Sequence, residues 1–508
     1  MRPLLNMREG HRTGLILGAY ALLALLVIPI YPHFVSPNEF TRWALDVAVL
    51  EHHTLEVTSV VAQFGPRFED LARRDGRLYT NKAPGTALLT LPAHAVALLF
   101  SDSIRPTLTA ARIAAATVPA LLTALLILRF AKRNGVAPER ARVVAWIALF
   151  ATPLFAYGFL LFAHALVAMA LFGAWLFLEE ERHALAGALT GLAVAAEYTA
   201  VFAAAILLVS VAARRDWRRL LKFVAAGVPF ALLLAAYHAA AFGSVFSNPY
   251  SFSTEYRELH ESGLFGLNVP SVATAARILI DPTYGLLVFS PVLLLGIAAI
   301  PAARAHLSKT SWWTMLLIPV VLLIVYAGYP YWYGGWNVAA RFLVPAIPFF
   351  IVPLLFRTNT SLEALLAGAS ATTVSLTTLV FPFVPESFAF PWSSLAMPLL
   401  GKGLVVPNLL HLISRPLAIA VPFAIVIAAA VAALGWRRSG IAAAGVVVAL
   451  VAGSAWTWFT VEPLVRLERD YIAEVYFERG GSMRGAIPPG LQRRRELEQR
   501  LPPGRWPF

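Results

Sequence analysis

The chain has 508 residues, of which 59% are hydrophobic and only 14% are charged, and its mean hydropathy is +0.69. This composition excludes an ordinary soluble domain. The formal net charge of +13 does not indicate a nucleic-acid partner, because the basic residues cluster in short loops between apolar segments, as in cytoplasmic loops of membrane proteins. The absence of cysteine excludes disulfides, thiolate metal sites and cysteine catalysis.

Long apolar windows recur along the whole chain. Windows of roughly 18–25 residues without Asp, Glu, Lys or Arg are long enough to cross a hydrocarbon core of about 30 Å. They include 13–31, 154–178, 223–242, 284–301, 310–329 and 441–459. We therefore predict an all-α polytopic membrane protein with about 13 transmembrane helices. The first apolar segment lacks a small-residue cleavage site, so we expect a retained span rather than a signal peptide.

The basic loops predict the sidedness of the chain. Cytoplasmic loops are enriched in Lys and Arg, and the basic loops alternate here with two long loops at 34–106 and 243–284. We expect these two loops, and the basic, Pro- and Gly-rich tail 461–508, to lie outside the transmembrane core 1–460 on the extracytoplasmic side. The short apolar segment 87–100 is expected to be a juxtamembrane or half-buried helix, because counting it as a span would invert all later loops.

The first outer loop contains eight carboxylates between residues 34 and 106, which is unusual for a polytopic membrane protein. Glu39, Arg42 and Asp46 have i, i+3, i+7 spacing, which places them on one face of a predicted helix that begins just outside the first span. A solvated helix face with a Glu39–Arg42 pair would explain the same spacing. The position of the helix at the mouth of the first span favours a function.

Two further outer segments carry residues suited to a lipid phosphate. The motif Tyr-Thr-Asn-Lys-Ala-Pro-Gly at 79–85 places Lys82 beside the N-terminus of the apolar segment 87–100, where cation and helix both favour phosphate. A lysine that only extends to the headgroups is the alternative. The aromatic stretch 329–342 contains a Gly-Gly turn and Arg341, which suit a polar lipid headgroup better than an aromatic belt alone.

In combination these motifs resemble a known family. They are the acidic residue after the first span, the 79–85 motif, Tyr-Gly-Leu-Leu-Val-Phe-Ser-Pro at 284–291, Gly-Gly-Trp-x-x-x-x-Arg-Phe at 334–342, and Ala-Ala-Glu-Tyr at 195–198. They resemble bacterial membrane glycosyltransferases of the GT-C superfamily, in the branch that includes protein O-mannosyltransferases and lipid A aminoarabinose transferases. The resemblance covers residues 10–360.

The resemblance implies a polyprenyl-phosphate-linked sugar as donor and an acidic residue of the first outer loop as general base. Glu39 matches the acidic position, although the family usually has Asp-Glu where this chain has Asn38-Glu39, so Asp46 is the alternative. Lys82, Arg341 and Arg42 are implied to bind the donor phosphate. The substrate-binding residues are expected to be Tyr79, Asn81, Trp336, Tyr256 and His260.

No cofactor is expected. The outer loops contain no Asp-x-Asp, so we expect cations rather than a divalent metal to stabilise the leaving phosphate. Glu197 lies within an apolar region, where a carboxylate indicates function by default, but a structural hydrogen bond would also explain it.

The predicted function is therefore transfer of a sugar to an acceptor hydroxyl at the outer face of the bacterial plasma membrane. The acceptor would be a lipid, a glycan or a protein. A polytopic transporter or lipid-linked glycan flippase is the alternative, and a glycan polymerase or ligase is a second enzymatic one. The concentration of polar residues in outer loops, without an internal repeat, favours the enzyme.

Overall fold

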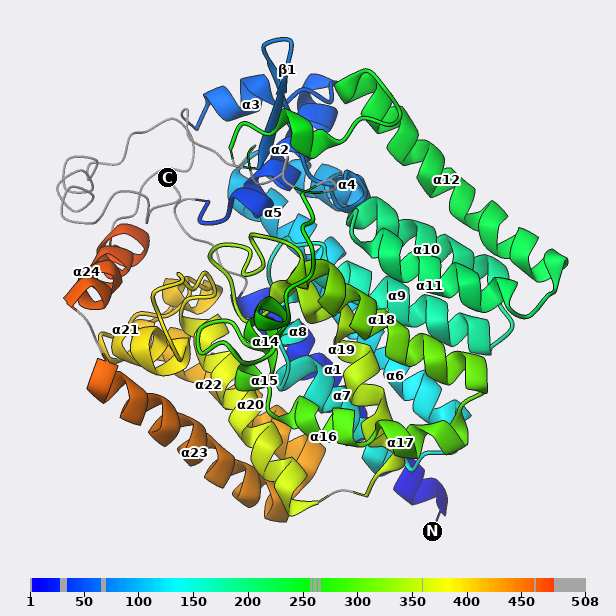
Figure 1. Cartoon of the computed structure of the whole chain (residues 1–508). Helices are drawn as coiled ribbons and strands as arrows, with labels where there is room; N and C mark the ends of the chain where they lie inside the picture. Colours follow the sequence, from blue (N-terminus) through cyan, green and yellow to red (C-terminus); the bar gives the residue numbers. More distant parts are fainter. Residues whose placement is uncertain are drawn as a thin grey trace.

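The computed structural model describes residues 2–27, 34–64, 70–255, 258, 263, 266–358, 360–460 and 463–478. Within these ranges the regular secondary structure is helical except for one two-stranded antiparallel hairpin and an isolated bridge to it (Figure 1). Helices are the expected way to satisfy backbone hydrogen bonds in hydrocarbon. The predicted all-α polytopic membrane protein is confirmed.

In the described part of the chain, seven helical segments are long and apolar enough to cross a membrane. The first is Gly10–Val27 of α1 (Arg2–Val27), and the second is continuous through α5 (Ile104–Arg112), a π-helical turn (Ile113–Thr117) and α6 (Val118–Arg133). The others are α12 (Trp217–Phe242), α18 (Lys309–Ala327), α20 (Ser361–Val380), α22 (Arg415–Leu434) and α23 (Trp436–Thr460), of which the window counted for α23 is Trp436–Trp456. Of these, α1, α12, α18 and α23 overlap apolar windows named in the sequence analysis.

Shorter or interrupted helices form other parts of the bundle, and they include the predicted apolar windows 154–178 and 284–301. These are α7 (Pro138–Phe150) with α8 (Leu154–Tyr157), α9 (His164–Glu179), α10 (His183–Ala196), α11 (Ala200–Ala212), α15 (Leu286–Phe289) with α16 (Val292–Ala298) and α17 (Ile300–Ala303), and a run of η4 (Arg341–Ala346), α19 (Ile347–Ile351) and η5 (Val352–Phe356). Helix α9 is apolar on all sides and almost wholly buried, which places it at the centre of the bundle.

The first long loop forms a cap on one end of the bundle. It contains α2 (Pro37–His52), α3 (Thr58–Ala62), the hairpin β1 (Leu71–Arg74) and β2 (Arg77–Thr80), and α4 (Gly85–Leu98), all in the upper part of Figure 1. Helix α4 has 14 residues and packs against α2 and α5, so it has the dimensions of the predicted juxtamembrane helix. The cap positions the side chains described below.

The second long loop meets this cap. Its first part contains a 3-10 turn, η2 (Pro249–Phe252), and Ser253 forms a bridge with Ala72 of β1. The backbone N–H of Thr254 also donates to the carbonyl of Leu71 at 2.9 Å. Helix α14 (Val272–Ile280) then leads to α15. The second loop therefore extends the hairpin at its edge.

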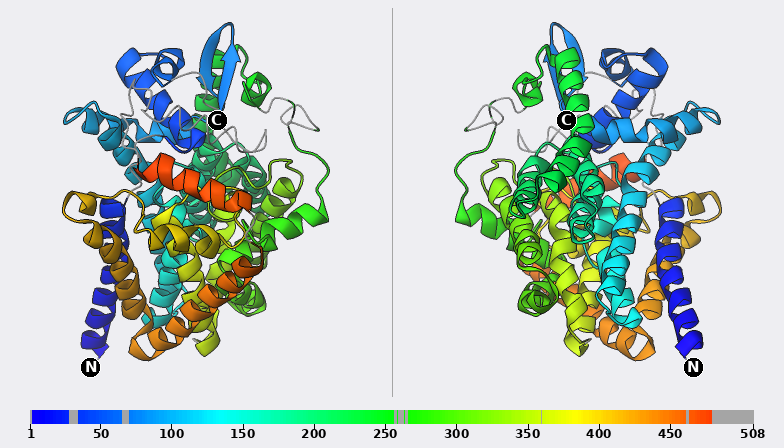
Figure 2. Two further views of the ribbon diagram at one scale, coloured as in Figure 1. Left: turned by 90° about the vertical axis from the view of Figure 1, so that its left-hand side faces the viewer. Right: turned by 90° about the vertical axis from the view of Figure 1, so that its right-hand side faces the viewer.

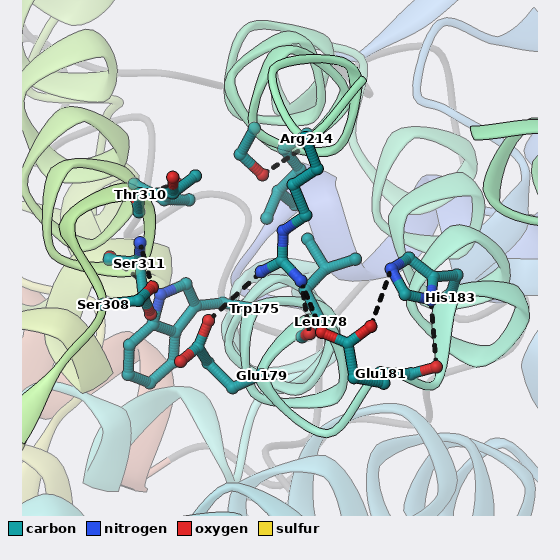
Figure 3. Close-up of polar contacts among 12 residues, drawn as sticks. Trp175, Leu178, Glu179, Glu181, His183, Arg214, Ser308, Thr310 and Ser311 are labelled. Carbon is teal, nitrogen blue, oxygen red and sulfur yellow. Dashed lines mark hydrogen bonds and ion pairs between the residues drawn. The ribbon is translucent and has the colours of Figure 1, made fainter. Parts of the chain in front are cut away.

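Basic loops lie toward the other end, where the N-terminal end of α1 and helix α17 are found (Figures 1 and 2). The guanidinium of Arg214, in the loop between α11 and α12, lies 3.3 Å from Glu179 at the end of α9 and 2.8 Å from Glu181 in the loop that follows α9 (Figure 3). The indole of Trp175 in α9 donates to the carbonyl of Ser311 at 3.2 Å and ties α9 to α18. Arg214 is thus matched by two neighbouring carboxylates.

The segment after α20 completes the bundle. It contains η6 (Trp392–Ala396), a π-helical turn, then α21 (Met397–Gly401) and the 3-10 turn η7 (Leu409–Leu412), before α22. After α23, α24 (Pro463–Ile472) and the π-helical turn η8 (Ala473–Glu478) bury Tyr471, Ile472 and Tyr476. The beginning of the predicted tail thus packs on the bundle.

Candidate active site

Helix α2 brings Arg42 into the interior of the cap. Eleven consecutive residues of α2, Asn38–Ala48, are buried, so this helix has no solvated face along that stretch. Nη1 of Arg42 donates to the carbonyl of Asn38 at 3.0 Å, and Nη2 lies 3.8 Å from Oε2 of Glu197. Nε of Arg42 is buried and has no hydrogen-bond acceptor among the described residues. A buried guanidinium N–H without an acceptor is costly and suits an anion.

The hairpin brings Lys82 and Asp70 together. Asp75 and Gly76 form its two-residue turn with φ of 49° and 80°, the left-handed conformation that Asp-Gly hairpins adopt. Antiparallel pairing then brings the start of β1 beside the end of β2, and the backbone N–H of Asn81 donates to the carbonyl of Asp70 at 3.3 Å. Nζ of Lys82 lies 2.7 Å from Oδ1 of Asp70.

Arg341 reaches the same region from the start of η4. Its guanidinium lies 5.3 Å from the ring centre of Phe162 and 4.7 Å from that of Phe342. Gly334 precedes it with φ of 75°, and a Cβ at this position would collide with Nε of Arg341. This Nε is also buried without an acceptor among the described residues. The Gly-Gly turn of the motif therefore makes room for the arginine.

Glu197 occupies the break between α10 and α11, where its backbone is extended. Gly85 packs against the backbone of Ala195 so closely that a Cβ would lie 2.5 Å from the Ala195 carbonyl carbon. The hydroxyl of Thr86 donates to the carbonyl of Ala196 at 3.2 Å. The Pro-Gly turn that follows Lys82 is thus held directly against the segment that carries Glu197.

Arg42, Asp70, Lys82, Glu197 and Arg341 form what we call the charged cluster. Burial raises the pKa of Asp70, but the charges of Lys82, Arg341 and Arg42 outweigh it, and the pKa lies below its ordinary value. Burial lowers the pKa of Lys82, and Asp70 partly opposes this effect. Three cations face two carboxylates, so the charged cluster has an excess of positive charge suited to an anionic ligand.

Aromatic side chains surround the charged cluster. Nζ of Lys82 lies 5.4 Å from the ring centre of Tyr250, which η2 of the second loop supplies. The ring of Tyr198 contacts Tyr250 edge-on at 6.2 Å, and Tyr326 stacks on Phe342 at 4.4 Å. Such rings can pack against the apolar faces of a sugar while their hydroxyl groups remain hydrogen-bond partners.

Glu39 and Asp46, the predicted candidates for general base, are engaged elsewhere. Glu39 is 1% exposed. Its carboxylate accepts hydrogen bonds from Nε of Arg112 at 2.8 Å, from Nη2 of Arg112 at 2.7 Å and from the backbone N–H of Leu161 at 2.7 Å. The fully buried Asp46 accepts from Thr90 at 2.6 Å and lies 3.3 Å from Nδ1 of His94. The contacts of Glu39 link α2 to the bundle, and those of Asp46 link α2 to α4.

The predicted substrate-binding residues are distributed unevenly. Asn81 is buried next to the charged cluster, and its Oδ1 has no partner among the described residues. The ring of Tyr79 packs on Phe242 at 5.8 Å, and Trp336 packs on Tyr476 at 6.4 Å. Tyr256 and His260 lie outside the described residues.

Sequence reasoning singled out Lys82, Arg42 and Arg341 but gave no role to Asp70. A signal for Asp70 existed, because Asp-Gly at 75–76 between two short strands predicts a hairpin that brings its two ends together. Within the described part of the chain, no group of three or more His, Asp or Glu side chains could hold a metal ion. The expectation that no cofactor is used stays a prediction.

No family model and no curated protein matches the chain. It is similar to the structure of ArnT from Cupriavidus metallidurans bound to undecaprenyl phosphate, with 13% identity, a TM-score of 0.49 and coverage of 90% of this chain and 79% of that chain. The corresponding values for the oligosaccharyltransferase AglB from Archaeoglobus fulgidus, in complex with an inhibitory peptide and a dolichol-phosphate, are 13%, 0.42, 93% and 60%. The arabinosyltransferase EmbB from Mycobacterium smegmatis is 13% identical, with a TM-score of 0.40 and coverage of 88% of this chain and 42% of that chain.

Proposed function

We propose that this protein is a membrane glycosyltransferase that moves a sugar from a polyprenyl-phosphate-linked donor to an acceptor hydroxyl. The observation that carries the proposal is the convergence of Arg42, Lys82 and Arg341 on one buried position with Asp70 and Glu197. These residues come from separate segments of the chain. Maintaining three buried cations in one place is costly unless a ligand compensates their charge.

The cations are suited to a phosphate leaving group. The Nε atoms of Arg42 and Arg341 are buried without acceptors among the described residues, and guanidinium N–H groups bind phosphate oxygens strongly. Lys82 adds a compact charge at the end of the hairpin, and it can exchange Asp70 for a phosphate oxygen. In the transition state, negative charge grows on this phosphate as the glycosidic bond breaks, and the three cations stabilise it.

Glu197 is the residue that we assign as general base. Its closest described charge contact is the 3.8 Å approach of Arg42, too long for a hydrogen bond, and its side chain is 16% exposed. Asp70 is a poorer base, because Lys82 holds it at 2.7 Å and its pKa is lowered. Glu39 already accepts three hydrogen bonds. This assignment replaces Glu39 and Asp46 of the sequence prediction.

In the proposed transfer, the acceptor hydroxyl displaces polyprenyl phosphate from the sugar. Glu197 takes the proton of the acceptor hydroxyl while the hydroxyl oxygen bonds to the anomeric carbon of the sugar. The bond between that carbon and the phosphate oxygen breaks, and the electron pair leaves with polyprenyl phosphate. The tyrosines around the charged cluster would pack against the sugar during the transfer.

The proposed location is the extracytoplasmic face of the bacterial plasma membrane. The basic loops lie toward the end of the bundle away from the cap (Figures 1 and 2), and such loops remain cytoplasmic in bacterial membrane proteins. The donor would then reach the charged cluster from the outer leaflet. The acceptor would be a lipid, glycan or protein at that surface.

A reconstituted transfer assay tests this proposal. Purified protein, supplied with a polyprenyl-phosphate-linked sugar and cell-envelope acceptors, should release polyprenyl phosphate together with glycosylated acceptor. Glu197→Gln, which preserves shape but not basicity, should lower turnover by roughly 10²–10⁴-fold with donor binding retained. If the protein in liposomes moved the intact lipid-linked sugar between leaflets without cleaving it, the flippase alternative would hold.

A further inference from the structure

A second polar feature lies away from the charged cluster, at the end of the bundle that carries the cap. A cleft of about 980 Å³ separates the C-terminal end of α1 from the start of α5, the segment between α21 and α22, and η8. None of the five residues of the charged cluster lines it. In both views of Figure 2, the loop around η7 lies beside the end of α1 at the outer edge of the bundle.

Three cations line this cleft from separate elements. Arg105 comes from α5, Lys402 follows α21, and Arg415 begins α22. The guanidinium of Arg415 is held in place, because Nε donates to the carbonyl of Gly403 at 2.9 Å and Nη2 to that of Lys402 at 2.8 Å. Lys402 also pairs with the half-exposed Asp470 at 2.9 Å. No carboxylate among the described residues forms an ion pair with Arg105 or Arg415.

Four leucines form an apolar part of the remaining lining of the cleft. Leu25 and Leu26 of α1, with Leu409 and Leu412 of η7, line it, and Leu412 is 86% exposed. These leucines lie where two predicted spans, α1 and α22, end and begin. Exposed leucines beside basic residues at the end of a span are suited to the boundary between acyl chains and headgroups.

We propose that this cleft binds a phospholipid with a net negative headgroup. The headgroup phosphate would lie among Arg105, Lys402 and Arg415, and an acyl chain would follow the leucines along α1. Two features distinguish the cleft from isolated basic residues that extend to the headgroups. The cations converge from three elements on one concave surface, and Arg415 is fixed by two backbone carbonyls. The proposal is independent of the glycosyltransferase function.

A local fluorescence reporter tests this site, because the native chain has no cysteine. Leu412→Cys at the exposed rim, labelled with bimane, is reconstituted in phosphatidylcholine nanodiscs that contain a minor fraction of brominated lipid. Brominated phosphatidylglycerol should quench the bimane severalfold more than brominated phosphatidylcholine with the same chains. The combined variant Arg105→Gln, Lys402→Gln, Arg415→Gln should remove this preference.

Two further variants separate a built site from general attraction of anionic lipid. Lys132→Gln, Arg215→Gln and Arg218→Gln remove the same charge from exposed positions outside the cleft and should leave the preference intact. Thr109→Trp fills the cleft while keeping its cations, and it should abolish the preference. A preference that survives Thr109→Trp, or that is lost equally in the matched charge variant, would overturn the proposal. Displacement by millimolar inorganic phosphate would instead assign the site to free phosphate.

Discussion

Two glutamate–arginine pairs in this protein each contain a buried arginine, yet their contacts differ. Glu39 and Arg112 form two parallel hydrogen bonds of 2.7–2.8 Å, and a backbone N–H completes the shell of the carboxylate. Glu197 and Arg42 approach only to 3.8 Å, and Nε of Arg42 has no acceptor among the described residues. Contacts within the protein fill the hydrogen-bonding capacity of the Glu39 carboxylate, whereas the second pair can still form hydrogen bonds to a ligand. Saturation, rather than burial alone, separates a structural charge from a reactive one here.

Replacing the glutamate of each pair by glutamine should have the largest effect that we expect. The change should mainly lower stability in the first pair and mainly lower turnover in the second. Glu39→Gln leaves Arg112 buried without a charged partner, so unfolding free energy in detergent should fall by about 3–5 kcal/mol. Glu197→Gln should change stability by less than about 1 kcal/mol, because its ion pair is long and partly exposed. Denaturation curves of both variants, measured beside their turnover, check the comparison. A Glu39→Gln protein that folds normally but loses turnover would restore Glu39 as the base.

The sequence predicted those features of the two pairs that depend on residues close together in the chain. Hydropathy located the helices, and the short motifs identified Lys82 and Arg341, because the Pro-Gly and Gly-Gly turns beside them are local features. Spacing also placed Glu39, Arg42 and Asp46 on one helix. It could not say which partner each would meet, because Arg112 and Glu197 come from other elements of the tertiary structure.

Asp70 and Glu197 are residues whose place in the charged cluster also depends on tertiary contacts. Asp70 reaches the charged cluster only because the hairpin returns the chain beside Lys82, and Glu197 only because Gly85 packs against Ala195. Asp-Gly at 75–76 was a readable signal for the hairpin. The packing of α4 on the α10–α11 break has no such signal, since it depends on contacts between residues about 110 positions apart, as between Thr86 and Ala196.

Asp46 offers an intermediate case, since it is buried and partly satisfied. Burial raises its pKa to about 6, against an ordinary value of 3.8, and hydrogen bonds from His94 and Thr90 only partly oppose this. The raised pKa means that the Asp46 carboxyl binds its proton more tightly in the folded state than in the unfolded state. This proton binding stabilises the fold below pH about 4, and the stabilisation is lost as the pH rises through about 6. The loss should be on the order of 3 kcal/mol, and Asp46→Asn should remove it.

Denaturation in detergent between pH 4 and pH 7 measures this dependence. The wild-type curve should fall relative to that of Asp46→Asn, while Asp75→Asn in the exposed hairpin turn should follow the wild type. Parallel wild-type and Asp46→Asn curves would show that the Thr90 and His94 contacts satisfy the ionised carboxylate. Asp46 would then resemble Glu39 in being saturated by the fold.

The smallest expected effect concerns the cations of the charged cluster, whose partner would be the ligand rather than the fold. Lys82→Ala and Arg341→Ala each remove charge-assisted hydrogen bonds to phosphate, so binding of polyprenyl phosphate should weaken by about 1.5–3 kcal/mol, or roughly one to two orders of magnitude. Arg77→Ala is the matched control, because it removes a cation from the same hairpin at a position where its side chain is 66% exposed. Titration of labelled polyprenyl phosphate into each purified variant measures the difference. Equal affinity in all three variants would mean that Lys82 and Arg341 are compensated within the protein, and the charged cluster would then be a structural network like the Glu39–Arg112 pair.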